Sequence, residues 1–244
     1  MDKSRLKQNI WRILLAVLCV CLLSVPVLML FLWAFGYALL FRYPTAFLCA
    51  MSVLAAAALV AVYIQKPIFS KAETVFAVFL PTAALFCGLK AAKSDSGVFA
   101  WLFAGILLVC CAVLLIKILP RALWKFLAAG FEMLLCGFFL LDMFFTVVFL
   151  GITCNTVVRT VPSPQNTYVA EVIDSNQGAL GGDTFVEVRK TASANILFFT
   201  VQSRSVRVYE GEWGEFETME TVWVDENTLL VNNETVYLDH FVLL

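Results

Sequence analysis

Long apolar runs fill the first 151 residues of the chain, and a pattern of alternating apolar and polar residues fills most of the remainder. A bilayer core about 30 Å thick is crossed by about 20 helical residues. Residues 1–12 form a basic N-terminus. Five apolar runs then come close to or exceed the spanning length, and we expect each to be a transmembrane helix, together forming a domain over 13–151: 13–40, 45–64, 72–89, 98–119 and 126–151.

The third run is short, contains Pro81 and has Glu73 near its start, so its assignment depends on the charges of the loops. Basic loops are concentrated on the cytoplasmic side of membranes. Five spans with the N-terminus inside place nine Lys/Arg inside and three outside; without the third span the count is eight against four. We therefore expect five spans, a cytoplasmic N-terminus and an exported C-terminal segment.

From residue 160 the apolar pattern has a period of two, which is typical of half-buried strands. We expect residues 152–164 to be a linker and 165–244 to be a small, mostly antiparallel β domain, with turns at 225–227 and 232–233. Seven short segments favour strands: 168–173, 184–188, 196–201, 206–209, 221–224, 228–231 and 236–238. Six aromatic residues are expected to supply the core of this domain: Phe198, Phe199, Trp213, Phe216, Trp223 and Tyr237.

Composition agrees with a membrane protein that also has an acidic, water-exposed part. The chain is 61% hydrophobic, with a mean hydropathy of +0.88, whereas soluble domains contain about 45–50% apolar residues. The lipid bilayer is therefore one partner. Residues 1–151 carry 12 Lys/Arg against 5 Asp/Glu, and residues 152–244 carry 5 against 13. The acidic segment would repel phosphates, so we expect no nucleic-acid partner.

Two carboxylates in the fifth run are the candidate intramembrane polar site. Asp142 lies near the middle of the run, and Glu132 lies towards its cytoplasmic end. An ionised carboxylate at that depth costs at least about 2.5–3.5 kcal/mol. Asp142 is therefore either a proton or cation site or a neutral carboxyl bonded to a neighbour, with three candidates: Ser52, Thr82 and Thr146. Glu132 can reach the interface by snorkelling.

No other pattern identifies a catalytic, metal or cofactor site, and we expect none. The acidic run between Glu210 and Glu226 could collect a hard cation, but its spacing matches no EF-hand loop, and such runs are usually solvated faces. His240 is the only histidine and has no Ser or Cys arranged beside it as a nucleophile. Four tryptophans fall near the ends of the expected spans, where indoles favour the headgroup region: Trp11, Trp33, Trp101 and Trp124.

Three short motifs resemble a domain-of-unknown-function family of bacterial, chiefly Gram-positive, membrane proteins. They are Ser163-Pro-Gln-Asn-Thr-Tyr168, Gly181-Gly-Asp-Thr184 and Trp223-Val-Asp-Glu-Asn-Thr-Leu-Leu-Val231. In that family the domain opens with a motif like S-P-D-G-K-Y and ends with W-x-D-x-x-T-L-x-I. This chain departs at Gln165 and Asn166, and the resemblance covers about 80 residues and none of the helices. It implies a bacterial plasma-membrane location and an extracytoplasmic β domain, and brings no catalytic residues.

These patterns together predict a helical membrane protein with five spans, followed by an exported acidic β domain. We expect a non-enzymatic protein of the bacterial plasma membrane whose β domain binds an envelope protein or a cell-wall ligand. The alternative is a transporter, or an accessory subunit of one, that uses Asp142.

Overall fold

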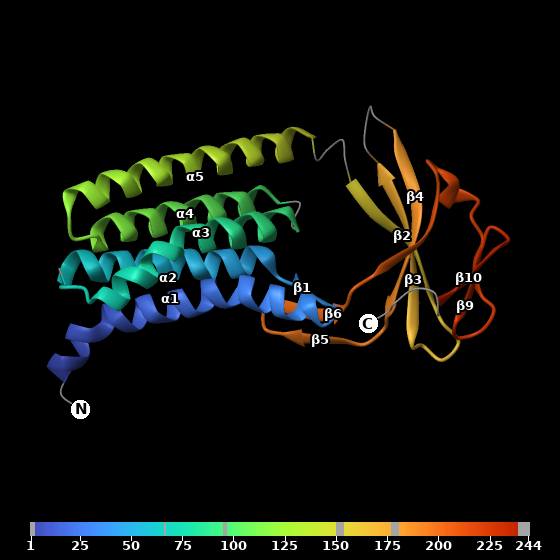
Figure 1. The fold of residues 1–244 in the computed structure, drawn as a ribbon, viewed down its shortest axis with the longest axis horizontal. Coiled ribbons are helices and arrows are strands. Elements are labelled where there is room, and N and C mark those ends of the chain that lie inside the picture. Colours follow the sequence, from blue (N-terminus) through green and yellow to red (C-terminus); the bar gives the residue numbers. More distant parts are fainter. Residues whose placement is uncertain (1–2, 66, 95–96, 150–153, 177–180, 239–244) are drawn as a thin grey trace. The chain divides into compact units, whose positions relative to one another are not determined.

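The computed structural model describes residues 3–65, 67–94, 97–149, 154–176 and 181–238. The chain divides into two compact units, shown in Figure 1. The helical unit comprises Met1–Leu30 and Phe41–Phe144, and the β unit comprises Phe31–Leu40 and Phe145–Leu244. His240 and residues 177–180 of the glycine-rich loop lie outside the described residues.

The helical unit is built from five long helices, each long and apolar enough to cross a membrane. Their order confirms the predicted fold class, five spans followed by antiparallel β sheets. The helices are α1 (Lys3–Ala34), α2 (Pro44–Gln65), α3 (Lys71–Lys93), α4 (Val98–Ile118) and α5 (Ala122–Phe149).

Several helix ends differ from the expected spans: α1 begins at Lys3, α3 continues to Lys93 and α5 begins at Ala122. The end of α1 and the start of α3 each have a clear local cause. The first helix ends at Ala34 and not at residue 40, because Gly36 adopts a left-handed φ of 78° that stops the helix. The third helix, α3, begins directly after Ser70, whose hydroxyl accepts from the backbone N–H of Glu73 at 3.2 Å. The carboxylate of Glu73 in turn accepts from the backbone N–H of Ser70 at 2.7 Å, which completes a capping box.

Small residues allow α3 and α4 to pack closely. A Cβ on Gly88 of α3 would lie 3.1 Å from the Cβ of Ala104 in α4, tighter than an ordinary contact. Alanines are buried along the same helices and in α2. In lipid, where apolar side chains gain little by leaving the bilayer, close backbone packing of this kind supplies much of the association.

One narrow stripe of α5 faces the other helices. Phe139 is buried, its ring lies 5.8 Å from that of Trp101, and it reaches Gly105 of α4. Most other large side chains of α5 are exposed, as lipid contact requires. Trp101 and Trp11 are both buried, so only Trp33 and Trp124 of the four tryptophans expose their rings as the expected headgroup position requires.

The β unit contains three sheets, in which β2-β3-β4-β7, β10-β9-β8 and β5-β6 pair antiparallel. One sheet has the order β2-β3-β4-β7, with bounds Cys154–Pro162, Tyr168–Asn176, Gly182–Lys190 and Val206–Glu212. A second has the order β10-β9-β8, with bounds Glu234–Tyr237, Thr228–Val231 and Thr221–Trp223. The third has the order β1-β6-β5, with bounds Tyr37–Phe41, Phe199–Ser203 and Ser193–Ile196.

The core of the β unit is mainly aliphatic. Ala170, Val172, Val186, Val188, Met219, Leu229, Val231, Val236 and Leu238 form one buried cluster. Of the six aromatic residues expected in the core, Phe216 and Trp223 pack against this cluster, whereas Trp213 and Tyr237 are 56% and 52% exposed. The expectation was wrong for these two because the inward positions of the strands are occupied by smaller β-branched and aliphatic residues.

Two strands lie where none was expected. The predicted linker 152–164 contains β2, an edge strand of the four-stranded sheet whose register with β3 runs from Cys154 opposite Asn176 to Pro162 opposite Val169. The end of the first expected span contains β1, which lies beside β6. The β unit therefore recruits chain from both sides of the expected domain boundary.

Candidate functional sites of the bundle and the β unit

Asp142 is paired with a cation. Its Oδ1 accepts from the Nζ of Lys93, the last residue of α3, at 2.9 Å. Its Oδ2 is buried and accepts no hydrogen bond from the described residues. None of the three expected neighbours is seen to bond it, and Ser52 donates instead to the backbone oxygen of Phe103 at 2.9 Å. A paired carboxylate avoids part of the cost of an isolated charge in lipid.

Glu132, which could reach the interface by snorkelling, is instead buried among the helices. Its side chain is only 4% exposed, and neither carboxylate oxygen accepts a hydrogen bond from the described residues. It shares the inward stripe of α5 with Cys136 and Phe139, four and seven residues later. The two intramembrane carboxylates are therefore not brought together.

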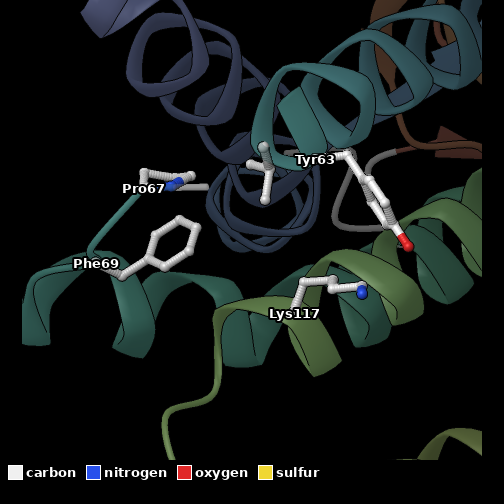
Figure 2. A pocket seen from close by; sticks show the side chains of 5 residues that line it. Tyr63, Pro67, Phe69 and Lys117 are labelled. Atoms are coloured by element: carbon white, nitrogen blue, oxygen red, sulfur yellow. The ribbon is translucent and has the colours of Figure 1, made fainter. Parts of the chain in front are cut away.

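Two adjoining hollows, of about 430 and 680 Å³, lie where α2, α3 and α4 begin or end. Both are lined by Pro67, Phe69 and Lys117. Figure 2 shows these side chains and Tyr63 around the smaller hollow. The ammonium group of Lys117 lies 4.5 Å from the centre of the Tyr63 ring, a cation–π contact that fixes the position of the charge.

The charge around these hollows is positive. The larger hollow adds Lys71 and Lys125 to Lys117, and no carboxylate is among the described residues that line either one. Ile68 and Val75 provide apolar walls. Ammonium groups beside apolar walls suit an anionic amphiphile and disfavour a cation. In the sequence these lysines served only to predict which side of the membrane each loop faces. That they lie around one pair of hollows depends on helix packing, which the sequence does not show.

The opening and closing motifs of the resemblance, 163–168 and 223–231, meet in one corner of the β unit. The Oγ of Ser163 donates to Glu226 Oε1 at 2.6 Å and accepts from the backbone N–H of Tyr168 at 3.0 Å. Glu226 also accepts from the backbone N–H of Gln165 at 2.8 Å and of Thr167 at 3.1 Å. The ring of Tyr168 stacks on that of Trp223, with centres 6.5 Å apart. The opening and closing motifs thus hold each other, which is a structural role.

The indole of Trp223 completes this corner. Its Nε1 donates to the backbone oxygen of Val161 at 3.0 Å, so it joins the three-stranded sheet to the edge strand β2. A buried indole N–H needs such an acceptor, and a Phe at this position would leave the carbonyl oxygen without this donor.

Glu226 should make the stability of this corner depend on pH. Desolvation alone would raise its pKa, but hydrogen bonds from Ser163, Gln165 and Thr167 outweigh that effect and lower the pKa below the usual glutamate value. A lowered folded pKa contributes stability above the unfolded pKa, and that contribution is lost as the pH falls through the folded pKa. We expect the melting temperature of Glu226→Gln to fall below that of wild type at neutral pH and to approach it in acid.

The matched control for this prediction is Glu217→Gln, which removes the same charge from the same unit. Thermal unfolding of the full chain in detergent, followed by tryptophan fluorescence over a pH series, supplies the measurement. A difference between Glu226→Gln and wild type that stays constant from neutral to acidic pH would show that the carboxylate is not the group responsible.

The acidic run is partly used inside the fold. Glu215 accepts from the hydroxyl of Tyr209 and the backbone N–H of Glu212, each at 2.8 Å, and from the side-chain amide of Asn232. Glu210 pairs with Arg207 at 3.2 Å. Within the described ranges, no three His, Cys, Asp or Glu side chains are grouped so that they could hold a metal ion.

Comparisons of this chain with family models, with curated proteins and with solved structures found no match.

Proposed function

We propose that this chain is a non-enzymatic, multi-pass protein of the bacterial plasma membrane, with a cytoplasmic N-terminus, whose exported acidic β domain binds an envelope protein or a cell-wall ligand. One observation carries the proposal: the β unit is attached to the membrane-spanning helices in two places. The first attachment is the covalent connection from α5 to β2. The second is the sheet in which β1, the connection between α1 and α2, lies beside β6.

A second attachment changes what the β unit can do. A domain on a single flexible linker samples many orientations, and each partner that binds it must offset the loss of that freedom. Pairing of β1 with β6 holds residues 37–40 inside the β unit, so this unit is joined to the membrane-spanning helices through β1 as well as through the connection from α5. More than one connection to the membrane-spanning helices supports recognition of a partner that is itself held in the envelope.

The outer face of the sheet β10-β9-β8 is the recognition surface that we propose. Along β8 and the residue after it, Val222 and Val224 are 55% and 64% exposed, whereas Thr221, the first residue of β8, is buried. Tyr237 of β10 is half exposed. Exposed apolar side chains on a sheet face mark interaction sites when they occur together. The acidic surroundings favour a partner with basic groups.

Site-specific photocrosslinking in intact cells tests this proposal. A photoreactive amino acid at Val222 of the full chain should form adducts with an envelope component, and the same group at Val157, half exposed on β2, is the matched control. Adducts that form with the photoreactive group at position 222 but not at position 157 support the proposal. Adducts absent at both positions, together with a pull-down of the full chain that returns nothing above background from cell-wall fractions, would count decisively against it.

A second candidate function, transport or support of a transporter, rests on Asp142. The buried Oδ2 without a hydrogen-bond donor among the described residues is the observation in its favour, because it leaves one oxygen of the pair with Lys93 open to a proton or cation. This function predicts that Asp142→Asn abolishes a flux while Asp142→Glu retains part of it. Equal fluxes for wild type and both variants would remove it.

A further inference from the structure

The hairpin formed by β5 and β6 ends in a turn of unusual composition. Ile196 pairs with Phe199, so Leu197 and Phe198 form a two-residue turn. Leu197 has a φ of 49° and is 83% exposed, and Ile196 is 56% exposed. Two-residue hairpin turns with positive φ favour Asn and Gly, not Leu. Water is therefore an unfavourable surrounding for the exposed side chains of this turn. The positive φ adds a steric cost for leucine that does not depend on the solvent.

The same chain contains another two-residue hairpin turn for comparison, in which both residues have a positive φ, whereas in the β5–β6 turn only Leu197 does. Between β9 and β10, Val231 pairs with Glu234, and the two turn residues are Asn232 and Asn233, with φ values of 46° and 67°. Asparagine tolerates this backbone and is polar. The contrast isolates the apolar side chains of the β5–β6 turn as the feature that needs an explanation.

The distribution of charged residues around the hairpin also suits a membrane surface. The segment 193–203 contains no charged residue, although residues 152–244 carry 18 charged side chains. Four of the five basic residues of that acidic segment lie close to the hairpin in sequence: Arg189, Lys190, Arg204 and Arg207. Arg189 pairs with Glu171 and Arg207 pairs with Glu210, so the proposal uses only Lys190 and Arg204. At its base, the hydroxyl of Ser203 accepts from the backbone N–H of Lys190 at 2.8 Å, which keeps Lys190 beside Arg204. An apolar tip with a basic base matches the order of acyl chains and phosphates at a membrane surface.

Strand β1, which pairs with β6, indicates where the hairpin lies relative to the membrane. The backbone N–H of Arg204, directly after β6, donates to the backbone oxygen of Gly36, directly before β1, at 2.9 Å. Thus β6 ends where β1 begins, and the turn of the hairpin lies towards the end of β1 that leads into α2. Since β1 joins two membrane-spanning helices within a few residues, every part of it lies near the membrane surface.

A contact between Trp33 and Arg204 also favours a position at the membrane surface. The guanidinium of Arg204 lies 5.0 Å from the centre of the Trp33 ring, and Trp33 is 61% exposed in the last turn of α1. Exposed indoles at helix ends favour the headgroup region, and arginine pairs with lipid phosphate there. From these observations we propose that the β5–β6 hairpin is a membrane-surface anchor, with Ile196 and Leu197 in the boundary between headgroups and acyl chains and with Lys190 and Arg204 at the phosphates.

Depth measurements on the full chain test this anchor. The eight native cysteines are replaced by alanine or serine, and a nitroxide is attached to Leu197→Cys in vesicles of phosphatidylethanolamine and phosphatidylglycerol. Collisions of the nitroxide with oxygen, which enriches in lipid, are compared with collisions with a water-soluble nickel complex. Asn233→Cys, in the turn between β9 and β10, is the matched control.

We expect the ratio of oxygen to nickel collisions to be several-fold higher at position 197 than at position 233. Adding Arg204→Gln and Lys190→Gln should lower the ratio at 197 in vesicles with phosphatidylglycerol and leave the ratio at 233 unchanged. Equal ratios at 197 and 233 would overturn the proposal. A label at 197 that meets nickel freely in vesicles but is protected in native membranes would also overturn it, because a protein and not lipid would then cover the hairpin.

Discussion

Val186→Asp is expected to unfold the β unit. Val186 lies in the middle of β4, the strand between β3 and β7, and it is fully buried in the aliphatic cluster. Its cross-strand neighbours are Val172, which is apolar, and Tyr209, whose hydroxyl already donates to Glu215, so neither supplies a cation for a carboxylate at this position. Burying an unpaired charge in such a site destabilises by about 4 kcal/mol or more, which is a large part of the stability of a small domain.

Limited proteolysis of the full chain in vesicles provides the measurement. The C-terminal unit of Val186→Asp should be cleaved rapidly, whereas the unit in wild type should resist. Val222→Asp introduces the same residue at a strand position that is 55% exposed, so it should resist as wild type does. Equal resistance of Val186→Asp and Val222→Asp would mean that the cluster around Val186 is not the core of this unit.

Breaking the ion pair between Lys93 and Asp142 should destabilise the helical unit, and removing both charges should restore most of the loss. The two groups lie 2.9 Å apart near the ends of their spans, so Asp142 is not near the middle of its span as expected. Lys93→Met leaves the partly buried carboxylate of Asp142 without its cation, and Asp142→Leu leaves the ammonium group of Lys93 without its anion. We expect each single variant to be clearly less stable than wild type and the double variant to be close to it, with a coupling of about 1–2 kcal/mol.

Unfolding of the full chain in mixed micelles gives the three differences in stability. An additive result, in which the double variant loses as much as both single variants together, would contradict the pairing. The same variants separate the two roles of Asp142. A structural partner tolerates the neutral pair Lys93→Met with Asp142→Leu, whereas a proton or cation site loses its flux in that double variant as well.

The positions of the membrane-spanning helices were predictable because they depend only on local composition. Each span needs only length and apolar side chains, and all five expected runs overlap the observed helices. The turn at Asn232 and Asn233 was also predictable, since both residues carry the positive φ that asparagine tolerates. Local chemistry and local structure agree at these positions.

Long-range pairings were not predictable from the sequence in the same way. The segment 196–201 has the composition of one strand, yet the chain reverses at Leu197 and Phe198 because β6 lies beside β1, more than 150 residues earlier in the sequence. The partner of Asp142 was missed because Lys93 had been counted as a loop charge, although α3 continues to that residue. Only packing determines which distant residues meet.

Accessibility of single cysteines in intact cells tests the central claim, an exported β domain after five spans, most directly. Three variants in a cysteine-free background, Asp95→Cys, Arg121→Cys and Asp225→Cys, are treated with a thiol reagent that does not cross the membrane. The account predicts labelling at 95 and 225 and protection at 121. Labelling at 121 with protection at 225 would contradict it, because the β domain would then lie in the cytoplasm and its partner would be intracellular.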